Sequence, residues 1–144
     1  MHPYARFSTA AALGVTLCSG CAQNDVISVG GSVLTDGSDS AQGRRVPLIQ
    51  FSTQDTVAQL VDFNWPDPTI DGGRHKVVWK WYHGNQLLSQ SGCGASNTTP
   101  LLFATTPWTL HTQRAAASLG IGHFKVQTVV DDNVVATNEF DAKP

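Results

Sequence analysis

The sequence predicts an all-β fold, an antiparallel sandwich. From Val46 onwards, short runs alternate apolar and polar residues with a period of two, and clusters of Gly, Pro, Asp and Asn separate these runs. Charged residues make up 14% of the chain, well below the level of an average globular protein. Thr, Val, Ser and Gly are abundant instead, which is typical of β proteins. A succession of about seven strands at this spacing fits an antiparallel sandwich.

The period-two runs place the strands along the chain. We expect them at 46–52, 56–65, 75–82, 86–91, 100–106, 108–113, 122–130 and 134–140. Alternatively, residues 100–113 form one strand that bends at Pro107. In the second run Val57, Val61, Phe63 and Trp65 share one face. Pro66 and Pro68 end it, because proline cannot donate to a ladder. The segment 114–120 is too short for a full helix and is expected to form one helical turn.

The run at 75–82 is expected to be a half-buried strand, because it carries two tryptophans between lysines. His75, Val77, Trp79 and Trp81 fall on one face, and Lys76, Lys80 and Tyr82 fall on the other. The chain then closes with a hairpin that turns at 131–133. The residues expected to point inward from this hairpin are Phe124, Val126, Thr128, Val134, Ala136 and Phe140.

Part of this pattern resembles the immunoglobulin-like β-sandwich modules of bacterial exported proteins. The resemblance is carried by the strand with Trp79 and Trp81, the helical crossover, the stretch 119–126 and the terminal Phe140, and it covers about residues 46–142. The Gly-x-Phe-x-Val element at 122–126 resembles the entry to strand F of that family. The resemblance implies an immunoglobulin-like sandwich without the disulfide of antibody domains.

Residues 1–20 are typical of a targeting segment. Arg6 precedes an uncharged run at 7–17, and the run with its small-residue flank is too short to span a bilayer. Cys18-Ser19-Gly20-Cys21 follows. This C-x-x-C spacing also occurs in redox and zinc sites, but no second Cys/His pair of matching spacing is present to complete a zinc site.

The four residues 18–21 resemble the lipobox of bacterial lipoproteins. The resemblance implies cleavage after Gly20 and acylation of Cys21, and two or three acyl chains give stable membrane attachment. In that family the residue after the cysteine affects sorting, and Ala22 favours the periplasmic side of the outer membrane. An ordinary secretory signal peptide is the alternative.

The chain is therefore divided into three parts. We expect a lipoprotein signal peptide at 1–20, a lipidated N-terminus and flexible tether at 21–45, and the sandwich domain at 46–144. A flexible tether of this length would reach roughly 27 Å. Within it, Val29-Gly30-Gly31-Ser32 is a possible hairpin turn, so part of the tether could add an edge strand.

Charge and cysteine content exclude some functions. Removal of 1–20 takes away Arg6 alone and leaves eight basic against eleven acidic residues, a net charge of −3, without any basic run. This balance argues against nucleic-acid binding. Cys93 would then be the remaining unmodified cysteine, as a free thiol or an intermolecular bridge.

The candidate site residues are few. His75, His83, His111 and His123 could bind zinc or copper, and the acid pairs Asp67/Asp71 and Asp131/Asp132 could bind calcium, but turn acids usually bond their own backbone. We predict no metal and no cofactor. Motifs of nucleophilic or zinc-dependent hydrolases are missing from the sequence, so we predict no catalytic residues. Tyr82, with Lys80 beside it on the polar face, is the aromatic residue expected to be exposed and to bind.

These observations lead to one preferred hypothesis and two alternatives. The preferred function is a lipid-anchored, non-enzymatic binding module that recognises a protein or glycan partner in the envelope. The first alternative is a periplasmic immunity or inhibitor protein that blocks a secreted toxin enzyme. The second is a metal-binding envelope protein.

Overall fold

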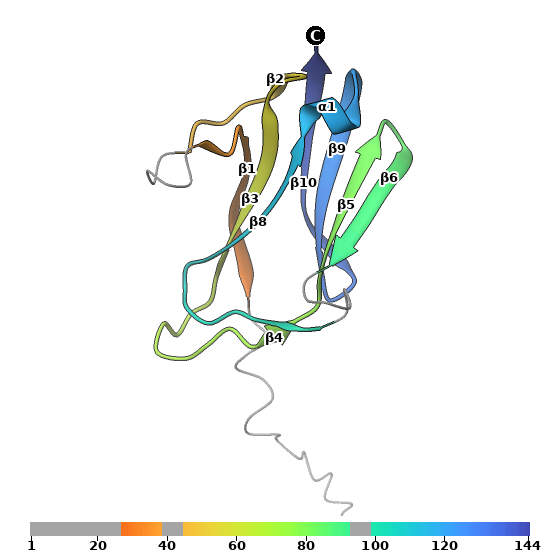
Figure 1. Ribbon diagram of the computed structural model, residues 1–144. Coiled ribbons are helices and arrows are strands. Elements are labelled where there is room, and N and C mark those ends of the chain that lie inside the picture. The colour runs from red at the N-terminus through yellow and green to blue at the C-terminus, as the bar shows by residue number, and fades with distance from the viewer. Residues whose placement is uncertain (1–26, 39–44, 93–98) are drawn as a thin grey trace, which may run out of the picture.

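The computed structural model describes residues 27–38, 45–92 and 99–144, which form a two-layer β-sandwich (Figure 1). A sheet in the order β1-β3-β8 faces a sheet in the order β2-β10-β9-β5-β6, and β4 pairs with β7 at one end. The elements are β1 (Ser28–Thr35), β2 (Gln50–Ser52), β3 (Thr56–Asn64), β4 (Arg74–His75), β5 (Val77–His83), β6 (Gln86–Gly92), β7 (Leu101–Leu102), β8 (Trp108–Ala115), α1 (Ala116–Leu119), β9 (Gly122–Val130) and β10 (Asn133–Lys143). The predicted all-β sandwich is confirmed.

The described residues form more strands than the expected runs, because β1 lies in the predicted tether and the run 75–82 divides into β4 and β5. Strands β2, β4 and β7 are only two or three residues long. Pairing is antiparallel except between β2 and β10, which run parallel. Within the described ranges, no helix is long and apolar enough to cross a membrane.

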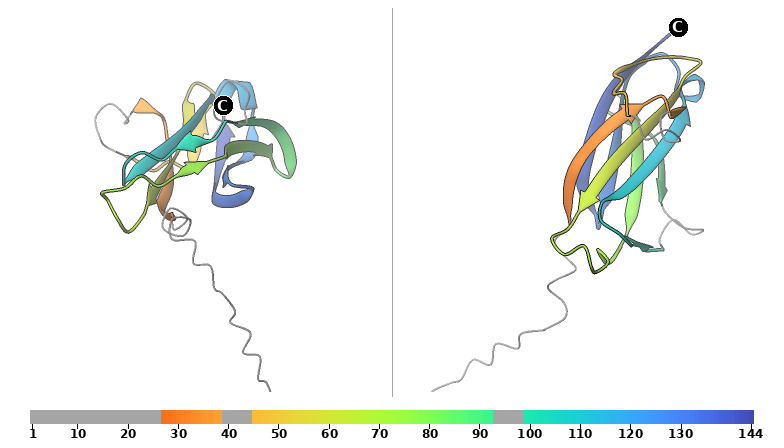
Figure 2. Two further views of the ribbon diagram at one scale, coloured as in Figure 1. Left: turned by 90° about the horizontal axis from the view of Figure 1, so that it is seen from below. Right: turned by 90° about the vertical axis from the view of Figure 1, so that its left-hand side faces the viewer.

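Strand β1 lies inside the segment predicted to be a tether. It pairs antiparallel with β3 along its whole length, so the sandwich begins at Ser28 and not at residue 46 (Figure 2, right). The possible hairpin at Val29–Ser32 does not form, and the register shifts there by a bulge instead. A Cβ at Gly30 would lie 2.4 Å from Asn64 Nδ2, so glycine permits the close approach of the two strands. A composition rich in Gly and Ser therefore marked a bulged edge strand.

Several predicted strands change their bounds. The run 46–52 pairs only at β2, and Pro47 has no amide to offer to a ladder. The run 75–82 divides at Lys76, whose amide donates to Asp131 Oδ1 (2.9 Å) instead of to a strand. The helical turn α1 is confirmed, but Arg114 belongs to β8.

The predicted hairpin at the end of the chain is confirmed as β9 and β10. Its turn places Asp131 and Asp132 at φ 49° and 66°, the left-handed region used by tight two-residue turns. The inward side chains agree with prediction except Val134, which is 54% exposed. The register shifts between Val134 and Ala136 through a bulge, and this turns Val134 to the opposite face.

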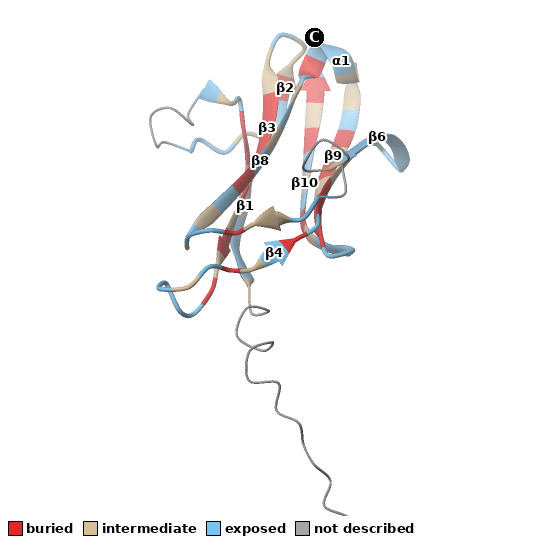
Figure 3. Cartoon of the chain, turned by 60° about the horizontal axis from the view of Figure 1, so that its bottom comes forward, coloured by how far each residue is buried: buried red, intermediate tan, exposed pale blue. Residues whose placement is uncertain are grey.

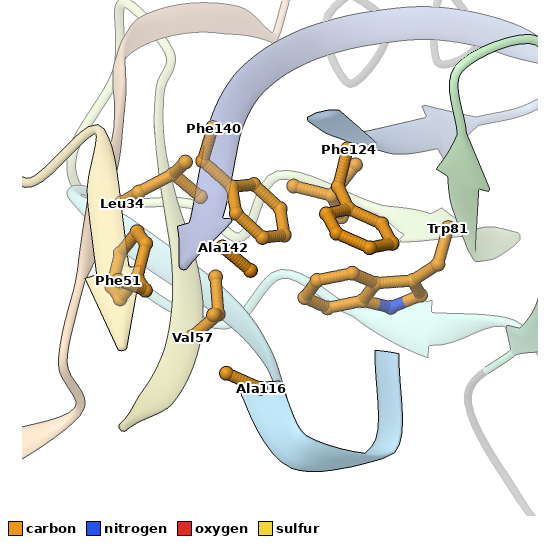
Figure 4. Close-up of a cluster of buried hydrophobic side chains, with 9 residues drawn as sticks. Leu34, Phe51, Val57, Trp81, Ala116, Phe124, Phe140 and Ala142 are labelled. Atoms are coloured by element: carbon orange, nitrogen blue, oxygen red, sulfur yellow. The ribbon is translucent and has the colours of Figure 1, made fainter. Parts of the chain in front are cut away.

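The core between the sheets consists of two clusters (Figure 3). The upper cluster, at the α1 end, comprises Leu34, Phe51, Val57, Trp81, Ala116, Phe124, Val126, Phe140 and Ala142 (Figure 4). The lower cluster, at the β4 end, comprises Val61, Phe63, Trp65, Val77, Phe103, Leu110, Val130 and Ala136. We call the two ends of the sandwich the upper and the lower end accordingly.

A buried polar network lies between the two clusters. Gln59 of β3 follows Val57 of the upper cluster and precedes Val61 of the lower one, and it is fully buried. Its Nε2 donates to Asn138 Oδ1 (2.8 Å), and its Oε1 accepts from Thr128 Oγ1 (2.7 Å). These contacts bond the two sheets to each other across the core.

Candidate functional site

The outer face of the five-stranded sheet carries the predicted binding residues. Along β5, Lys80 and Tyr82 alternate with Trp79 and Trp81, and Trp81 is 2% exposed in the upper cluster. Lys80 and Tyr82 therefore point away from the core, as the period-two pattern predicted. Both side chains are half-buried, so Tyr82 is less exposed than we expected.

Residues of two neighbouring strands complete this face. The register places Lys125 of β9 beside Tyr82, and Glu139 of β10 beside Lys125. Asp141 of β10 lies opposite His123 of β9 in the same way. We call this set the Tyr82 face: Lys80, Tyr82, His123, Lys125, Glu139 and Asp141.

A cation covers the tyrosine ring. Lys125 Nζ lies 4.7 Å from the centre of the Tyr82 ring, within the range of a cation–π contact. This contact holds both side chains against the sheet, which explains why Tyr82 is half-buried without entering the core. One ring face of Tyr82 is thus already occupied by a protein side chain.

His123 lies between two carboxylates at the upper edge of the Tyr82 face. Its Nδ1 is 2.9 Å from Asp141 Oδ1, and its Nε2 is 3.3 Å from Glu139 Oε2. The hydrogen bond to Asp141, followed by the one to Glu139, raises the pKa of His123 above its usual value. All three side chains are about half exposed, so the imidazole and both carboxylates are accessible to solvent.

A second group of titratable residues closes the lower end. His75 is 6% exposed, and its Nδ1 lies 2.6 Å from Asp131 Oδ2 while its Nε2 lies 2.8 Å from the Gly72 carbonyl oxygen. Its ring also packs on Phe103, with 4.7 Å between centroids. Gly72 has no room for a side chain, because a Cβ would lie 2.8 Å from Trp65 Cζ3. The His75 ring is built into the fold, whereas the Asp131 carboxylate that bonds it is half exposed.

The candidate metal ligands considered in the sequence do not converge in the described part of the chain. His75, His83, His111 and His123 are distributed over β4, β5, β8 and β9, and no group of three or more His, Cys, Asp or Glu in the described ranges could hold a metal ion. The turn acids bond nearby backbone instead: Asp67 Oδ1 accepts from the Thr69 amide (2.9 Å) and Asp71 Oδ1 from the Gly73 amide (3.0 Å). The hydrogen bonds from Thr69 lower the pKa of Asp67.

The two cysteines of interest, Cys21 and Cys93, lie outside the described residues. The partners of Tyr82 were not found from the sequence. Lys125, Glu139 and Asp141 alternate with buried residues on their own strands, which shows that they point outward, but the pattern does not show which strand lies beside β5. Another missed group is Arg45, which pairs with Asp62 and donates to Thr109 Oγ1 (3.1 Å) across β3 and β8.

Comparison with solved structures identifies the class of fold. An immunoglobulin-like protein of Pseudomonas aeruginosa matches 81% of this chain over 96% of its own length, with a TM-score of 0.53 and 8% identity. The alkylpurine DNA glycosylase of Pseudomonas fluorescens, solved bound to DNA containing an abasic site analogue, matches 82% of this chain with a TM-score of 0.54 and 7% identity. That match covers 30% of the glycosylase. No family model and no curated protein matches the sequence. The chain thus has an immunoglobulin-like β-sandwich fold.

Proposed function

We propose that this chain is a lipoprotein anchored through acylated Cys21 on the periplasmic side of the outer membrane. Its sandwich acts there as a non-enzymatic binding module, and the Tyr82 face contacts the partner. The anchor is supported by the residues 18–21 and by the targeting segment before them. The binding role is supported by the residues of the Tyr82 face, because an immunoglobulin-like fold can carry many different functions.

The observation that carries the proposal is the composition of the Tyr82 face. Two lysines, a tyrosine, a histidine and two carboxylates lie on three adjacent strands. None of these side chains belongs to the buried core, and the folded state does not need them for packing. A sheet face with an aromatic residue and charges of both signs is suited to specific recognition.

The chemistry of this face favours a protein partner over a glycan. A sugar that stacked on the ring face of Tyr82 that Lys125 covers would have to displace this lysine. The lysines and carboxylates of the Tyr82 face can instead pair with complementary charges on a protein.

Site-specific photo-crosslinking tests the binding role. A photoreactive phenylalanine analogue at Tyr82 should form an adduct with one defined protein in intact cells. The same analogue at His111, which is exposed on the outer face of the other sheet, is the matched control. Lys125→Ala and Lys80→Ala should weaken the adduct at Tyr82. Equal adducts at both positions, or none at Tyr82, would contradict the proposal.

Metabolic labelling with a fatty-acid analogue tests the anchor. The wild-type chain should incorporate the label and Cys21→Ser should not. An unlabelled wild-type chain, or a labelled Cys21→Ser variant, would refute acylation at this residue. The role as an immunity or inhibitor protein would use the same face, and a crosslinked partner that proved to be a secreted toxin enzyme would identify it.

A further inference from the structure

The chain enters the sandwich at its lower end. Ile27 packs against the lower cluster, and Ser28, the first residue of β1, pairs with Asn64 at the end of β3. The strand then runs toward Leu34 of the upper cluster (Figure 1). Any anchor that precedes Ile27 is therefore connected to the end of the molecule that holds β4, β7 and the Asp131–Asp132 turn.

The connection to Cys21 is short. Only residues 22–26 separate Cys21 from Ile27. Six residue steps cover at most about 22 Å when the chain is fully extended. The sequence alone suggested a tether that ended at residue 45, and it is the pairing of β1 with β3 that removes most of that length.

The sandwich is longer than this connection. Strand β10 runs from Asn133, beside Val130 of the lower cluster, to Lys143, which follows Ala142 of the upper cluster. Its eleven residues span roughly 34 Å at the rise of an antiparallel strand. A chain that starts at the membrane surface and reaches about 22 Å cannot turn such a body upside down.

We infer that the acylated protein stands on the membrane with its lower end toward the lipid and with the Tyr82 face in the half that points away. This orientation rests on the acylation of Cys21 that is proposed above. Tyr82, Lys125, Glu139 and Asp141 each adjoin a residue of the upper cluster in sequence, which places them at the far end. The partner must therefore approach from the aqueous side or extend an aqueous domain to that height.

In the part of the chain that the structure describes, the lower end has no charge pattern that would hold it flat on a bilayer. Its exposed charges are Asp67, Asp71, Asp131 and Asp132 against Arg74 and Lys76. Membranes with anionic lipids attract basic surfaces and repel acidic ones. The orientation thus depends on the length of the connection and its entry point, and not on adsorption of the lower end to lipid.

Fluorescence quenching in lipid vesicles tests the orientation. The purified acylated chain, with Cys93→Ser, is labelled at Pro68→Cys in the lower-end loop or at Asn85→Cys in the upper turn, both exposed positions. The vesicles contain phosphatidylethanolamine, phosphatidylglycerol and a lipid with a nitroxide on its headgroup. We expect strong quenching at position 68 and several-fold weaker quenching at position 85. Equal quenching, or stronger quenching at position 85, would overturn the inference.

Two controls separate this inference from the proposed function. A flexible Gly/Ser insertion of about 20 residues before Ile27 should reduce the difference between the two positions, because the chain can then reach past the sandwich. A difference that persists with the insertion would show that connection length does not set the orientation. Wild-type protein that fails to float with the vesicles would overturn both the anchor and the orientation, whereas protein that floats but is quenched equally would overturn the orientation alone.

Discussion

The upper and lower clusters close the same sandwich by different means. The upper cluster is entirely apolar and draws its residues from regular strands and from α1, with the rings of Phe124 and Phe140 stacked at 5.5 Å. The lower cluster includes Trp65 and Phe103 from irregular segments, and polar contacts support it. Trp65 Nε1 donates to the Ile70 carbonyl (2.9 Å), and the Gly72 amide donates to the Phe103 carbonyl (2.7 Å).

The difference follows from what covers each end. At the upper end, the ladders, α1 and the loop residue Asp55, which accepts from the Ser52 and Ala116 amides, satisfy backbone groups outside the cluster, so the cluster itself needs only to pack. At the lower end, a long connection between β3 and β4 crosses the opening, and its buried amides and carbonyls need specific partners. Not every buried donor at the lower end has an acceptor: Trp108 Nε1 is buried without a hydrogen-bond partner among the described residues. The lower end is therefore the part whose stability depends on polar geometry.

The largest effect is expected from the upper cluster. Trp81→Ala removes the largest fully buried side chain of the core and should lower the free energy of unfolding by about 3–5 kcal/mol. Chemical denaturation of the wild-type protein and of the Trp81→Ala variant measures this loss. Trp108→Ala is the matched control, because Trp108 is only partly buried, and its loss should be smaller. Equal losses would show that the two clusters do not differ in packing.

The network between the clusters should show strong coupling. Gln59→Met keeps the side-chain length but leaves Thr128 Oγ1 without its acceptor, at an expected cost of about 1–3 kcal/mol. In the double variant, Thr128→Val also removes the hydroxyl group that lost its acceptor, so most of the lost stability should be recovered. A double-mutant cycle in denaturant measures the coupling. Additive losses would mean that Gln59 and Thr128 act independently.

A smaller and local effect is expected at the lower end. His75→Ala removes the hydrogen bonds of both ring nitrogens and should lower the free energy of unfolding by about 1–2 kcal/mol. Hydrogen exchange should increase in residues 65–75 while the amides of the upper strands stay protected. His111→Ala, an exposed histidine of β8, serves as the control. Exchange that rises equally at both ends would contradict the separation of the two clusters.

The ion pair of Arg45 and Asp62 should contribute less, and only above acidic pH. The hydrogen bond from Arg45 holds the pKa of Asp62 below its usual value. The contribution is therefore fully present above about pH 4 and is lost as pH falls through the lowered pKa of the folded protein. Arg45→Ala should cost about 0.2–1 kcal/mol near neutral pH, since both side chains are partly exposed. If the stability lost in Arg45→Ala were the same in acid, the effect would come from side-chain packing and not from the ion pair.

The smallest effect is expected at His123, with the opposite dependence on pH. Asp141 and Glu139 raise its pKa in the folded protein. Its contribution is present below the ordinary histidine pKa of about 6.5 and is lost as pH rises through the raised value. Melting curves of the wild-type protein and His123→Ala should differ in acidic buffer and converge in alkaline buffer. A titration of His123 by NMR that shows no raised pKa would contradict this assignment.

The sequence predicted those parts of the fold in which large residues alternate regularly. Val57, Val61 and Phe63 on β3, and Phe124 and Val126 on β9, are buried as expected, because period-two patterning records which face meets the core. The prediction was wrong at the bulge beside Val134. In the glycine-rich β1, the possible edge strand is confirmed, but a bulge stands where a hairpin turn was expected. The glycines of β1 are a local signal of a bulge, whereas the bulge between Val134 and Ala136 has no such signal in the sequence.

The candidate site was predicted only within one strand. Alternation placed Lys80 and Tyr82 on the outer face correctly. Lys125 and Glu139 could not be assigned to Tyr82, because β9 lies 39 residues after β5 along the chain and only the folded sheet makes the two strands neighbours. The acylation of Cys21 stays a prediction, since the residue lies outside the described structure.

The turn between β9 and β10 depends on contacts with a distant part of the chain. Asp131 and Asp132 adopt backbone angles that glycine and asparagine favour, yet Asp131 uses its carboxylate to bond His75 and the Lys76 amide. Both of these groups lie more than fifty residues earlier in the chain. A synthetic peptide of residues 122–143 would lack them and should populate this turn poorly, so the C-terminal hairpin takes its shape from residues that are synthesised long before it.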